Sequence, residues 1–268
     1  MNEGKVWLVT GTSRGFGRAI CDAALAAGDD VIATARQPDS LDDFAKAHPG
    51  ALVLPLDVTD TAAARAAVRD GARRFGRIDV VVNNAGYGHV GAVEELSDEE
   101  LRSLYEVNFF GVLNVTRAAL PQLRRQGSGH LVQMSSLNGI VGMAGGGHYA
   151  ASKFAIEGLS ESLAEELEPL GIRVTIVEPG PYRTGFLGAG IRFAQPIDDY
   201  EPIVGPAREA LAAIDGNQPG DPAEAARAIV ECVHSPDPPL RLPLGKIAVE
   251  GIRDKLTAQL AELEVAVG

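Results

Sequence analysis

Three side chains in this sequence are suited to moving a proton on and off an oxygen atom: Ser136, Tyr149 and Lys153. Tyr149 and Lys153 are four residues apart, so a helix would place them on one face. An ammonium group stabilises a phenolate, and we therefore expect Lys153 to lower the pKa of Tyr149 towards neutrality. Ser136 ends a strand-like run, and its hydroxyl can donate to a carbonyl oxygen on which negative charge develops. A tyrosine–lysine pair at this spacing also arises by chance in many helices, so its interpretation depends on the surrounding sequence.

A glycine-rich turn follows the first strand-like run of the chain. Residues 10–17 contain Gly11, Gly15 and Gly17. Glycine permits the backbone angles of a tight strand-to-helix turn, and a bare backbone lets a pyrophosphate reach the N-terminus of the next helix. The spacing differs from the general dinucleotide fingerprint, and a purely structural turn is the alternative interpretation. The position directly after the first strand favours a dinucleotide site.

Arg36 follows the second strand-like run, at the place where an acidic residue would bind the ribose 2′-hydroxyl of NAD. Together with Arg14 in the glycine turn, it can clamp a 2′-phosphate, which an acid would repel. Either arginine alone is also compatible with a solvated surface position. The pair predicts that the chain binds NADP(H) in preference to NAD(H).

The elements that must position these groups alternate along the chain. Short runs that are apolar on both faces predict buried parallel strands at residues 6–10, 31–35, 51–56, 78–82, 130–134 and 173–177, with a last short strand at 241–244. Helical patterns fall at 18–27, 62–75, 101–125, 150–170, 223–234 and 249–265. This alternation predicts an α/β fold with a doubly wound parallel sheet covered by helices on both faces. Nothing between the elements has the composition of a linker, so residues 1–268 are predicted to form one domain.

Residues 182–222 interrupt this alternation with glycine, proline and mixed apolar sequence that has no clean periodicity. A long loop inside a compact domain is usually a lid or a binding segment. The segment is therefore predicted to be a substrate lid. Its apolar side chains can cover a hydrophobic substrate, or they can simply pack the lid onto the domain.

The composition excludes several classes of protein. The chain has 268 residues, with 24 lysines and arginines against 36 aspartates and glutamates, a formal net charge of −12. That excess disfavours nucleic acid and anionic membranes as partners. Two cysteines, Cys21 and Cys232, cannot build a disulfide framework and are expected to be buried in helices. We expect a soluble cytoplasmic protein without a metal site, because no cluster has zinc-like spacing.

The motifs occur in an order that resembles the short-chain dehydrogenase/reductase family, in its single-domain form of roughly 250 residues. The similarity spans nearly the whole chain to about Thr184. It rests on the turn at 10–17, Asp57-Val58, Asn83-Asn84-Ala85-Gly86, Asn108, Ser136, Tyr149 with Lys153, and Pro179-Gly180 leading to Thr184. The sequence around Tyr149 is similar to the hydroxysteroid- and retinol-dehydrogenase-like branch. The resemblance implies a Rossmann fold and a homodimer or homotetramer, with the helices at 101–125 and 150–170 as the expected interface.

The resemblance also assigns roles to individual residues. Tyr149 is expected to act as general acid in reduction and general base in oxidation, Lys153 to bind the nicotinamide ribose, and Ser136 to orient the carbonyl. Asn108 is expected to hold a water that joins a proton relay. The implied cofactor contacts are Gly11, Ser13, Arg14, Gly15, Phe16, Gly17, Arg36, Asp57, Val58, Asn84, Ala85, Gly86, Tyr149, Lys153, Pro179, Gly180, Tyr182 and Thr184. Position alone adds Asn138, Met143 and Phe186 as candidate substrate contacts.

These expectations converge on an NADP(H)-dependent oxidoreductase that transfers hydride between the nicotinamide and a small apolar carbonyl or alcohol substrate. A non-catalytic redox sensor that binds NADP(H) is the alternative, although a pure sensor has no physical need for Ser136, Tyr149 and Lys153. An epimerase or dehydratase using the same tyrosine and lysine is a third possibility. Such enzymes usually carry a fuller C-terminal substrate domain.

Overall fold

The computed structural model describes residues 4–267 and is built on a sheet of seven parallel strands. Their order across the sheet is β3-β2-β1-β4-β6-β7-β9. The strands span Val6–Thr10 (β1), Asp30–Ala35 (β2), Leu52–Pro55 (β3), Val80–Asn83 (β4), Gly129–Met134 (β6), Ile172–Pro179 (β7) and Arg241–Leu244 (β9). The chain winds outward in one direction from β1 and in the other from β4, so the predicted doubly wound Rossmann arrangement is confirmed. Ligands bind at the carboxyl ends of the strands beside such a reversal point.

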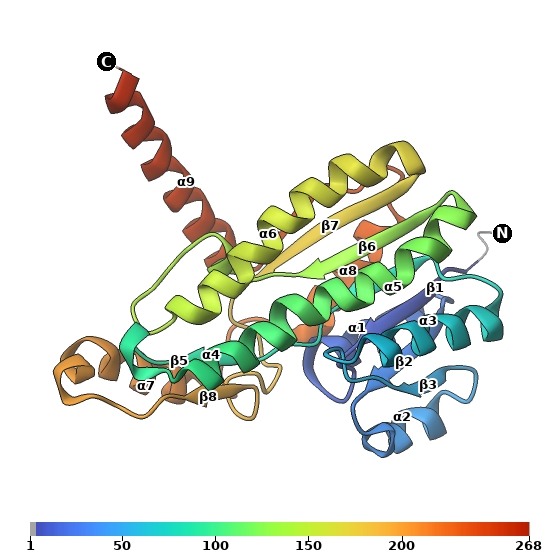
Figure 1. Cartoon of the computed structure of the whole chain (residues 1–268), viewed down its shortest axis with the longest axis horizontal. Coiled ribbons are helices and arrows are strands. Elements are labelled where there is room, and N and C mark those ends of the chain that lie inside the picture. Colours follow the sequence, from blue (N-terminus) through green and yellow to red (C-terminus); the bar gives the residue numbers. More distant parts are fainter. Residues whose placement is uncertain (1–3, 268) are drawn as a thin grey trace.

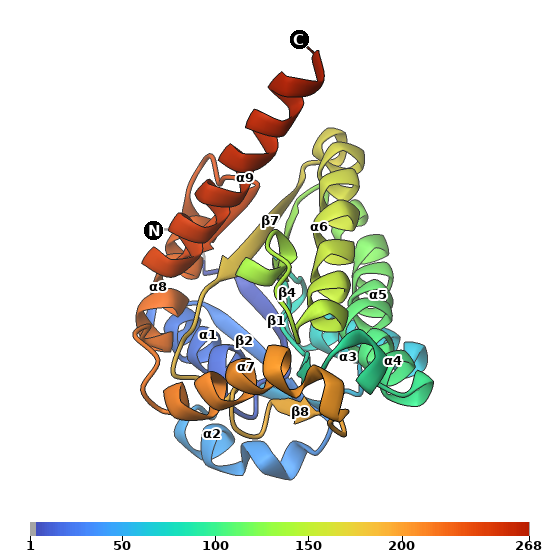
Figure 2. The same cartoon turned by 90° about the vertical axis from the view of Figure 1, so that its left-hand side faces the viewer.

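Helices cover both faces of this sheet (Figures 1 and 2). Along β1, Trp7 and Val9 join one buried cluster with α1 (Gly15–Ala26), α2 (Asp42–Ala47) and α8 (Pro222–His234). Val6 and Leu8 join the other, with α3 (Thr61–Phe75), α5 (Gly111–Gln126) and α6 (Gly147–Leu167). Successive side chains of a strand point to opposite faces, so a strand covered on both sides must be apolar throughout. Cys21 in α1 and Cys232 in α8 are buried, as predicted.

The helix predicted at 101–125 is not continuous. The structure has α4 (Asp98–Tyr105), a π-helical turn at Glu106–Phe110, and then α5. Ser97 begins α4 with a capping box, since its hydroxyl accepts from the Glu100 amide while the Glu100 carboxylate accepts from the Ser97 amide. The acidic residues Asp98, Glu99 and Glu100 thus form the first turn of α4, where negative charge is favourable. The π-helical turn was not predictable from periodicity, because apolar residues continue through it.

The segment 182–222 is not the loop that its composition predicts. It contains strand β8 (Ile191–Phe193) and helix α7 (Glu201–Ile214). Strand β8 pairs in parallel with β5 (Gly88–Val90), which follows β4, and together they form a separate two-stranded sheet. Proline misled the prediction: Pro202 lies in the first turn of α7, where a missing N–H costs nothing, and Pro206 is tolerated within the helix.

The last helix, α9 (Lys246–Val267), begins three residues earlier than predicted and leaves the body of the molecule (Figures 1 and 2). Short 3-10 turns complete the fold at Pro38–Leu41, Val93–Glu95, Leu137–Gly139, Glu168–Leu170 and Asp198–Tyr200. Among the helices of residues 4–267, none has the length and apolar character of a membrane span.

Candidate active site

The glycine turn between β1 and α1 is fixed by contacts that tolerate only glycine. Gly11 and Gly15 have φ angles of +69° and +61°, in the left-handed region. A Cβ on Gly17 would lie 2.4 Å from the Gly11 carbonyl oxygen and 2.6 Å from Nδ2 of Asn84. The backbone therefore passes close to itself and to the loop after β4.

Asn84 holds this turn in place. Its Nδ2 donates to the carbonyl oxygens of Thr10 at 2.8 Å and Gly11 at 3.1 Å. The Thr10 hydroxyl oxygen accepts from the backbone N–H groups of Asn84 and Ala85. The resemblance assigns Asn84 and Ala85 to the adenosine side of a cofactor. The structure adds a role that sequence reasoning missed, since these residues join the ends of β1 and β4.

The start of α1 is suited to an anion. Arg14 is its N-cap residue, makes no capping hydrogen bond within residues 4–267, and is followed by a first turn without acidic side chains. The first N–H groups of a helix carry partial positive charge and need acceptors. The Arg14 guanidinium donates to the carbonyl oxygen of Ala189 at 3.0 Å, so it reaches across to the segment 182–222. Ser13 is exposed beside it.

Arg36, Asp57 and Val58 follow β2 and β3 at the same edge of the sheet. Arg36 is exposed. Burial alone would raise the pKa of Asp57, but hydrogen bonds from the Thr59 N–H and hydroxyl, with the nearby Arg36 charge, hold that pKa below its usual range. Val58 is buried and its carbonyl oxygen accepts from Asn114 in α5. An ionised Asp57 beside an exposed Arg36 is therefore the polar edge of this site.

Ser136, Tyr149 and Lys153 come together where β6 ends and α6 begins. The Ser136 side chain lies close enough to Tyr149 to act on its pKa, and Nζ of Lys153 lies 5.8 Å from the centre of the Tyr149 ring. The ammonium donates to the Met134 carbonyl oxygen at 2.7 Å.

The two pKa values in this group move in opposite directions. Burial raises the pKa of Tyr149 to about 12, and the Ser136 side chain opposes that rise. The expected lowering of the Tyr149 pKa towards neutrality is therefore wrong for this structure, because burial of the phenol outweighs the groups that would lower its pKa. Burial lowers the pKa of Lys153 to about 8, and the charge of Glu157 opposes that shift.

Asn108 occupies the π-helical turn Glu106–Phe110 and is buried. Its Oδ1 accepts from the Tyr87 N–H, and its Nδ2 donates to the Tyr87 carbonyl oxygen and to Oγ of Ser152. Ser152 lies between Tyr149 and Lys153 on α6. The side chain of Asn108 thus ties the loop after β4 to the helix of the candidate acid–base pair. A π-helical turn inside a helix frequently marks a functional position.

The end of β7 leads back to the glycine turn. A Cβ on Gly15 would lie 3.0 Å from the Thr184 carbonyl oxygen, and the rings of Phe16 and Tyr182 are 5.2 Å apart. Pro179 ends β7, and the Gly180 N–H donates to Leu244 in β9. Tyr182 and Thr184 therefore lie against the glycine turn, and their contact with a cofactor stays a prediction.

Two of the three candidate substrate residues lie beside the Ser136–Tyr149 pair. The Phe186 ring lies 5.9 Å from the Tyr149 ring, and the Asn138 N–H donates to Oγ of Ser136. Met143 is exposed on the loop before α6. Gly86 approaches Asn108, since a Cβ on it would lie 3.1 Å from Asn108 Oδ1. The structure thus brings Phe186 and Asn138 to the Ser136–Tyr149 pair and leaves Met143 at the rim.

Sequence reasoning missed a buried acidic cluster beneath this site. Glu157 from α6 and Glu178 from β7 are 5% and 1% exposed, and both lie beside Arg241 of β9, at 3.5 Å and 3.2 Å. Burial raises the pKa of Glu178 to about 7, Glu157 adds to the rise, and Arg241 opposes it. Glu157 also reaches the loop of Ser136, because a Cβ on Gly139 would lie 2.8 Å from its Oε1. One signal was available: Glu157 follows Lys153 by four residues on a helix.

Comparisons with known proteins agree with this geometry. The family model for short chain dehydrogenases matches residues 5–190. The oxidoreductase BOA17 of Botryotinia fuckeliana is 42% identical over 248 residues, which cover 92% of this chain and 90% of that protein. The crystal structure of a short-chain dehydrogenase from Streptomyces avermitilis is similar with a TM-score of 0.92 and 47% identity, covering 98% of this chain and 96% of that one.

A more distant solved structure carries a cofactor analogue. The alcohol dehydrogenase of the archaeon Thermococcus sibiricus, complexed with 5-hydroxy-NADP, has a TM-score of 0.74 and 30% identity, covering 90% of this chain and 96% of that one. The family match extends over the glycine turn, the Asn84 loop and the Ser136–Tyr149–Lys153 group alike. The chain therefore belongs to the short-chain dehydrogenase family of oxidoreductases.

Proposed function

We propose that this protein is an NADP(H)-dependent dehydrogenase or reductase of small apolar carbonyl and alcohol compounds, with Tyr149 as its general acid and base. The observation that carries the proposal is the meeting of Ser136, Tyr149 and Lys153 at the carboxyl end of β6, on the same side of the sheet as the glycine turn. Parallel α/β sheets bind their ligands at that edge.

The residues present fit a nicotinamide dinucleotide. The uncapped start of α1 would bind the pyrophosphate, and Arg36 with Arg14 would bind a 2′-phosphate. Asp57 and Val58 would contact the adenine, and Asn84 to Gly86 the adenosine side. Residues 179–184 would hold the carboxamide end. The Thermococcus sibiricus relative, which was solved with an NADP analogue, supports this class of cofactor.

The chain's own groups would handle the proton. In reduction, the Ser136 hydroxyl donates to the carbonyl oxygen, and the Tyr149 hydroxyl transfers its proton to the alkoxide oxygen that forms. The bound nicotinamide supplies or accepts the hydride. A Tyr149 pKa of about 12 keeps the phenol protonated at neutral pH, which is the state that reduction needs. The charged Lys153 stabilises the phenolate that the transfer leaves behind.

An aromatic side chain beside the Tyr149 ring favours an apolar substrate. The Phe186 ring lies beside Tyr149, and Asn138 is the polar group next to Ser136. The sequence similarity to the hydroxysteroid and retinol branch points to the same class. A hydrophobic site with few polar groups orients its ligand through those groups.

Replacement of the Tyr149 hydroxyl tests the acid–base role. Tyr149→Phe is expected to lower kcat for NADPH-dependent carbonyl reduction at least about a hundredfold, since general acid–base catalysis typically contributes that much. NADPH affinity, measured by fluorescence quenching, should change less than about threefold. Retention of full activity in the variant would refute the assignment.

The substrate panel for this test should include ketones, aldehydes, quinones and steroids. Failure of the unaltered protein to oxidise NADPH with every compound, combined with tight NADPH binding, would favour the non-catalytic sensor instead.

Arg36 tests the cofactor preference. We expect NADPH to bind more tightly than NADH, and Arg36→Ala to weaken NADPH binding about tenfold while NADH binding changes little, because only NADPH has the 2′-phosphate. Arg69→Ala, an exposed arginine on α3, is the matched control. Equal affinities of the unaltered protein for both cofactors would contradict the prediction.

A further inference from the structure

The outer part of α9 presents an apolar face to solvent. From Arg253 to Ala266 every side chain except Lys255 is exposed. Leu256, Leu260 and Leu263 are 52%, 57% and 63% exposed. Only the base of the helix is anchored, through buried Ala248 and Ile252. A helical segment of this length is marginal in water on its own, and helices in proteins owe most of their stability to packing of an apolar face.

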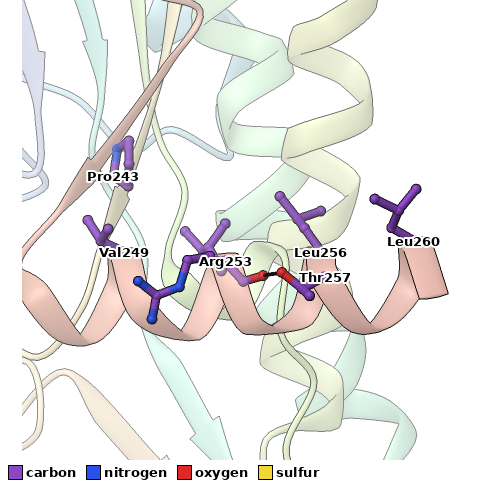
Figure 3. A pocket seen from close by; sticks show the side chains of 7 residues that line it. Pro243, Val249, Arg253, Leu256, Thr257 and Leu260 are labelled. Carbon is purple, nitrogen blue, oxygen red and sulfur yellow. Dashed lines mark hydrogen bonds between the residues drawn. The ribbon is translucent and has the colours of Figure 1, made fainter.

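The exposed apolar residues lie along one stripe. Val249, Ile252, Leu256, Leu260 and Leu263 recur at intervals of three or four residues, the pattern of a helix face that packs on a partner. Figure 3 shows Val249, Leu256 and Leu260 projecting from the same side of the helix, with Pro243 of β9 at its base. Together with neighbouring side chains they line an open groove of about 410 Å³. Val265, 82% exposed, lies on the opposite side, half a turn away from Leu256.

The charges beside this stripe change sign along the helix. Arg253 and Lys255 flank it near its middle, and Glu262 and Glu264 flank it near its end. Arg253 forms an ion pair with its neighbour Asp254 at 3.3 Å, but both side chains are largely exposed. This ion pair therefore contributes little to stability, and Arg253 can exchange it for another carboxylate.

This distribution matches an antiparallel copy of the same helix. If two α9 helices cross between residues 258 and 259, Arg253 of each lies opposite Glu264 of the other, and Lys255 opposite Glu262. The same register places Leu256 opposite Ala261, one residue from Leu260 of the partner helix. A parallel pair would bring Arg253 beside Lys255 and Glu264 beside Glu262, and such like-charge neighbours cost free energy. A single antiparallel register therefore buries the apolar stripe and pairs opposite charges on both of its flanks.

We infer that α9 is a self-association surface, on which a second copy of this chain packs its own α9 in antiparallel orientation. A two-fold axis generates such an interface from one surface patch. Lipid is a poorer occupant, because the end of the helix carries only acidic charges and the whole chain has a net charge of −12. The surface is distinct from the helices α5 and α6, which the family resemblance suggests as an interface.

The inference is tested by the mass of the full-length protein in solution, measured by sedimentation velocity over a range of concentrations. Leu260→Glu buries two like charges in the pair and is expected to raise the dimer dissociation constant at least about tenfold. Val265→Glu, on the opposite face, adds the same charge and should leave the constant unchanged. Circular dichroism checks that both variants remain folded.

A charge exchange tests the orientation. Arg253→Glu alone should weaken association through repulsion from Glu264, and the double variant Arg253→Glu/Glu264→Arg should restore it. A monomeric unaltered protein would overturn the inference. So would a mass distribution that Leu260→Glu leaves unchanged at every concentration, or a double variant that associates no better than Arg253→Glu.

Discussion

Two opposing effects act on the pKa of Lys153. Burial lowers its pKa to about 8, while the carboxylate of Glu157, one helical turn away, favours the charged ammonium. Glu157 is itself faced by Arg241 of β9, Glu178 of β7, Ser135 after β6 and Glu161 on its own helix. Lys153 must stay charged to stabilise a phenolate at Tyr149, so the acidic cluster acts on the proposed chemistry through Lys153.

This coupling predicts a pH dependence. NADPH-dependent reduction should decline as the pH rises through about 8, where Lys153 loses its proton. Glu157→Gln removes the anion that favours the ammonium, so the decline should begin at lower pH. Profiles of kcat/KM against pH measure the shift.

Glu161→Gln is the control for that experiment, because Glu161 also contacts Arg241 but is 57% exposed in its side chain. An unchanged profile for Glu157→Gln, or an equal shift for Glu161→Gln, would contradict the coupling.

At the scale of the elements, the glycine turn contains a glycine that has no room for a Cβ, whereas α6 contains one that does. Gly17→Ala forces a Cβ onto the Gly11 carbonyl and the Asn84 amide, and should lower the free energy of unfolding by about 1–3 kcal/mol. Gly158 is an exposed position of α6, and a Cβ there meets no atom within 4 Å. Gly158→Ala should therefore raise the free energy of unfolding by about 0.5–1 kcal/mol, since alanine favours the helix. Urea denaturation measures both. A neutral Gly17→Ala would show that the turn is looser than described.

The elements also show what the sequence can and cannot predict. Strands of the main sheet were predicted because residues such as Val81 and Ile32 lie in runs that are apolar on both faces. Strands β5 and β8 have three residues each, too few for a periodic pattern, and their pairing joins positions about a hundred residues apart. Helix α7 was missed because its prolines look like helix breakers.

The candidate site was foreseen for a different reason. Ser136, Tyr149 and Lys153 are recognisable through residue type and local spacing, which the sequence displays directly. Glu178 and Arg241 were not, because their partner Glu157 is far away in sequence and only the fold brings them together. The burial that raises the pKa of Tyr149 is likewise a product of packing.

At the scale of the whole molecule, Arg241 connects the edge strand β9 to its neighbour β7 and to helix α6. It neutralises acids from α6 and β7 that would otherwise be buried without a counter-charge. Arg241→Gln is therefore expected to lower the free energy of unfolding at pH 8 by about 2 kcal/mol, less than for a fully buried pair because Arg241 is partly exposed.

That loss should depend on pH. The pKa of Glu178 is already raised to about 7 in the folded protein, and removal of Arg241 raises it further. A raised carboxyl pKa stabilises the fold at low pH and loses that contribution as the pH rises, so the deficit should be smaller at pH 5 than at pH 8. Thermal melts at both pH values measure it, with Arg69→Gln as the exposed control. An equal deficit at the two pH values would contradict this account.

The small sheet of β5 and β8 has a consequence for how ligands would enter and leave the proposed site. The Gly88 N–H donates to Gly190, the Ala194 N–H donates to Val90, and Arg14 of the glycine turn donates to Ala189. The segment proposed to cover the substrate is thus fastened both to the chain that leaves β4 and to the turn proposed to bind the pyrophosphate. Opening of this segment would require that these hydrogen bonds break. Release of the substrate would therefore be coupled to release of the cofactor.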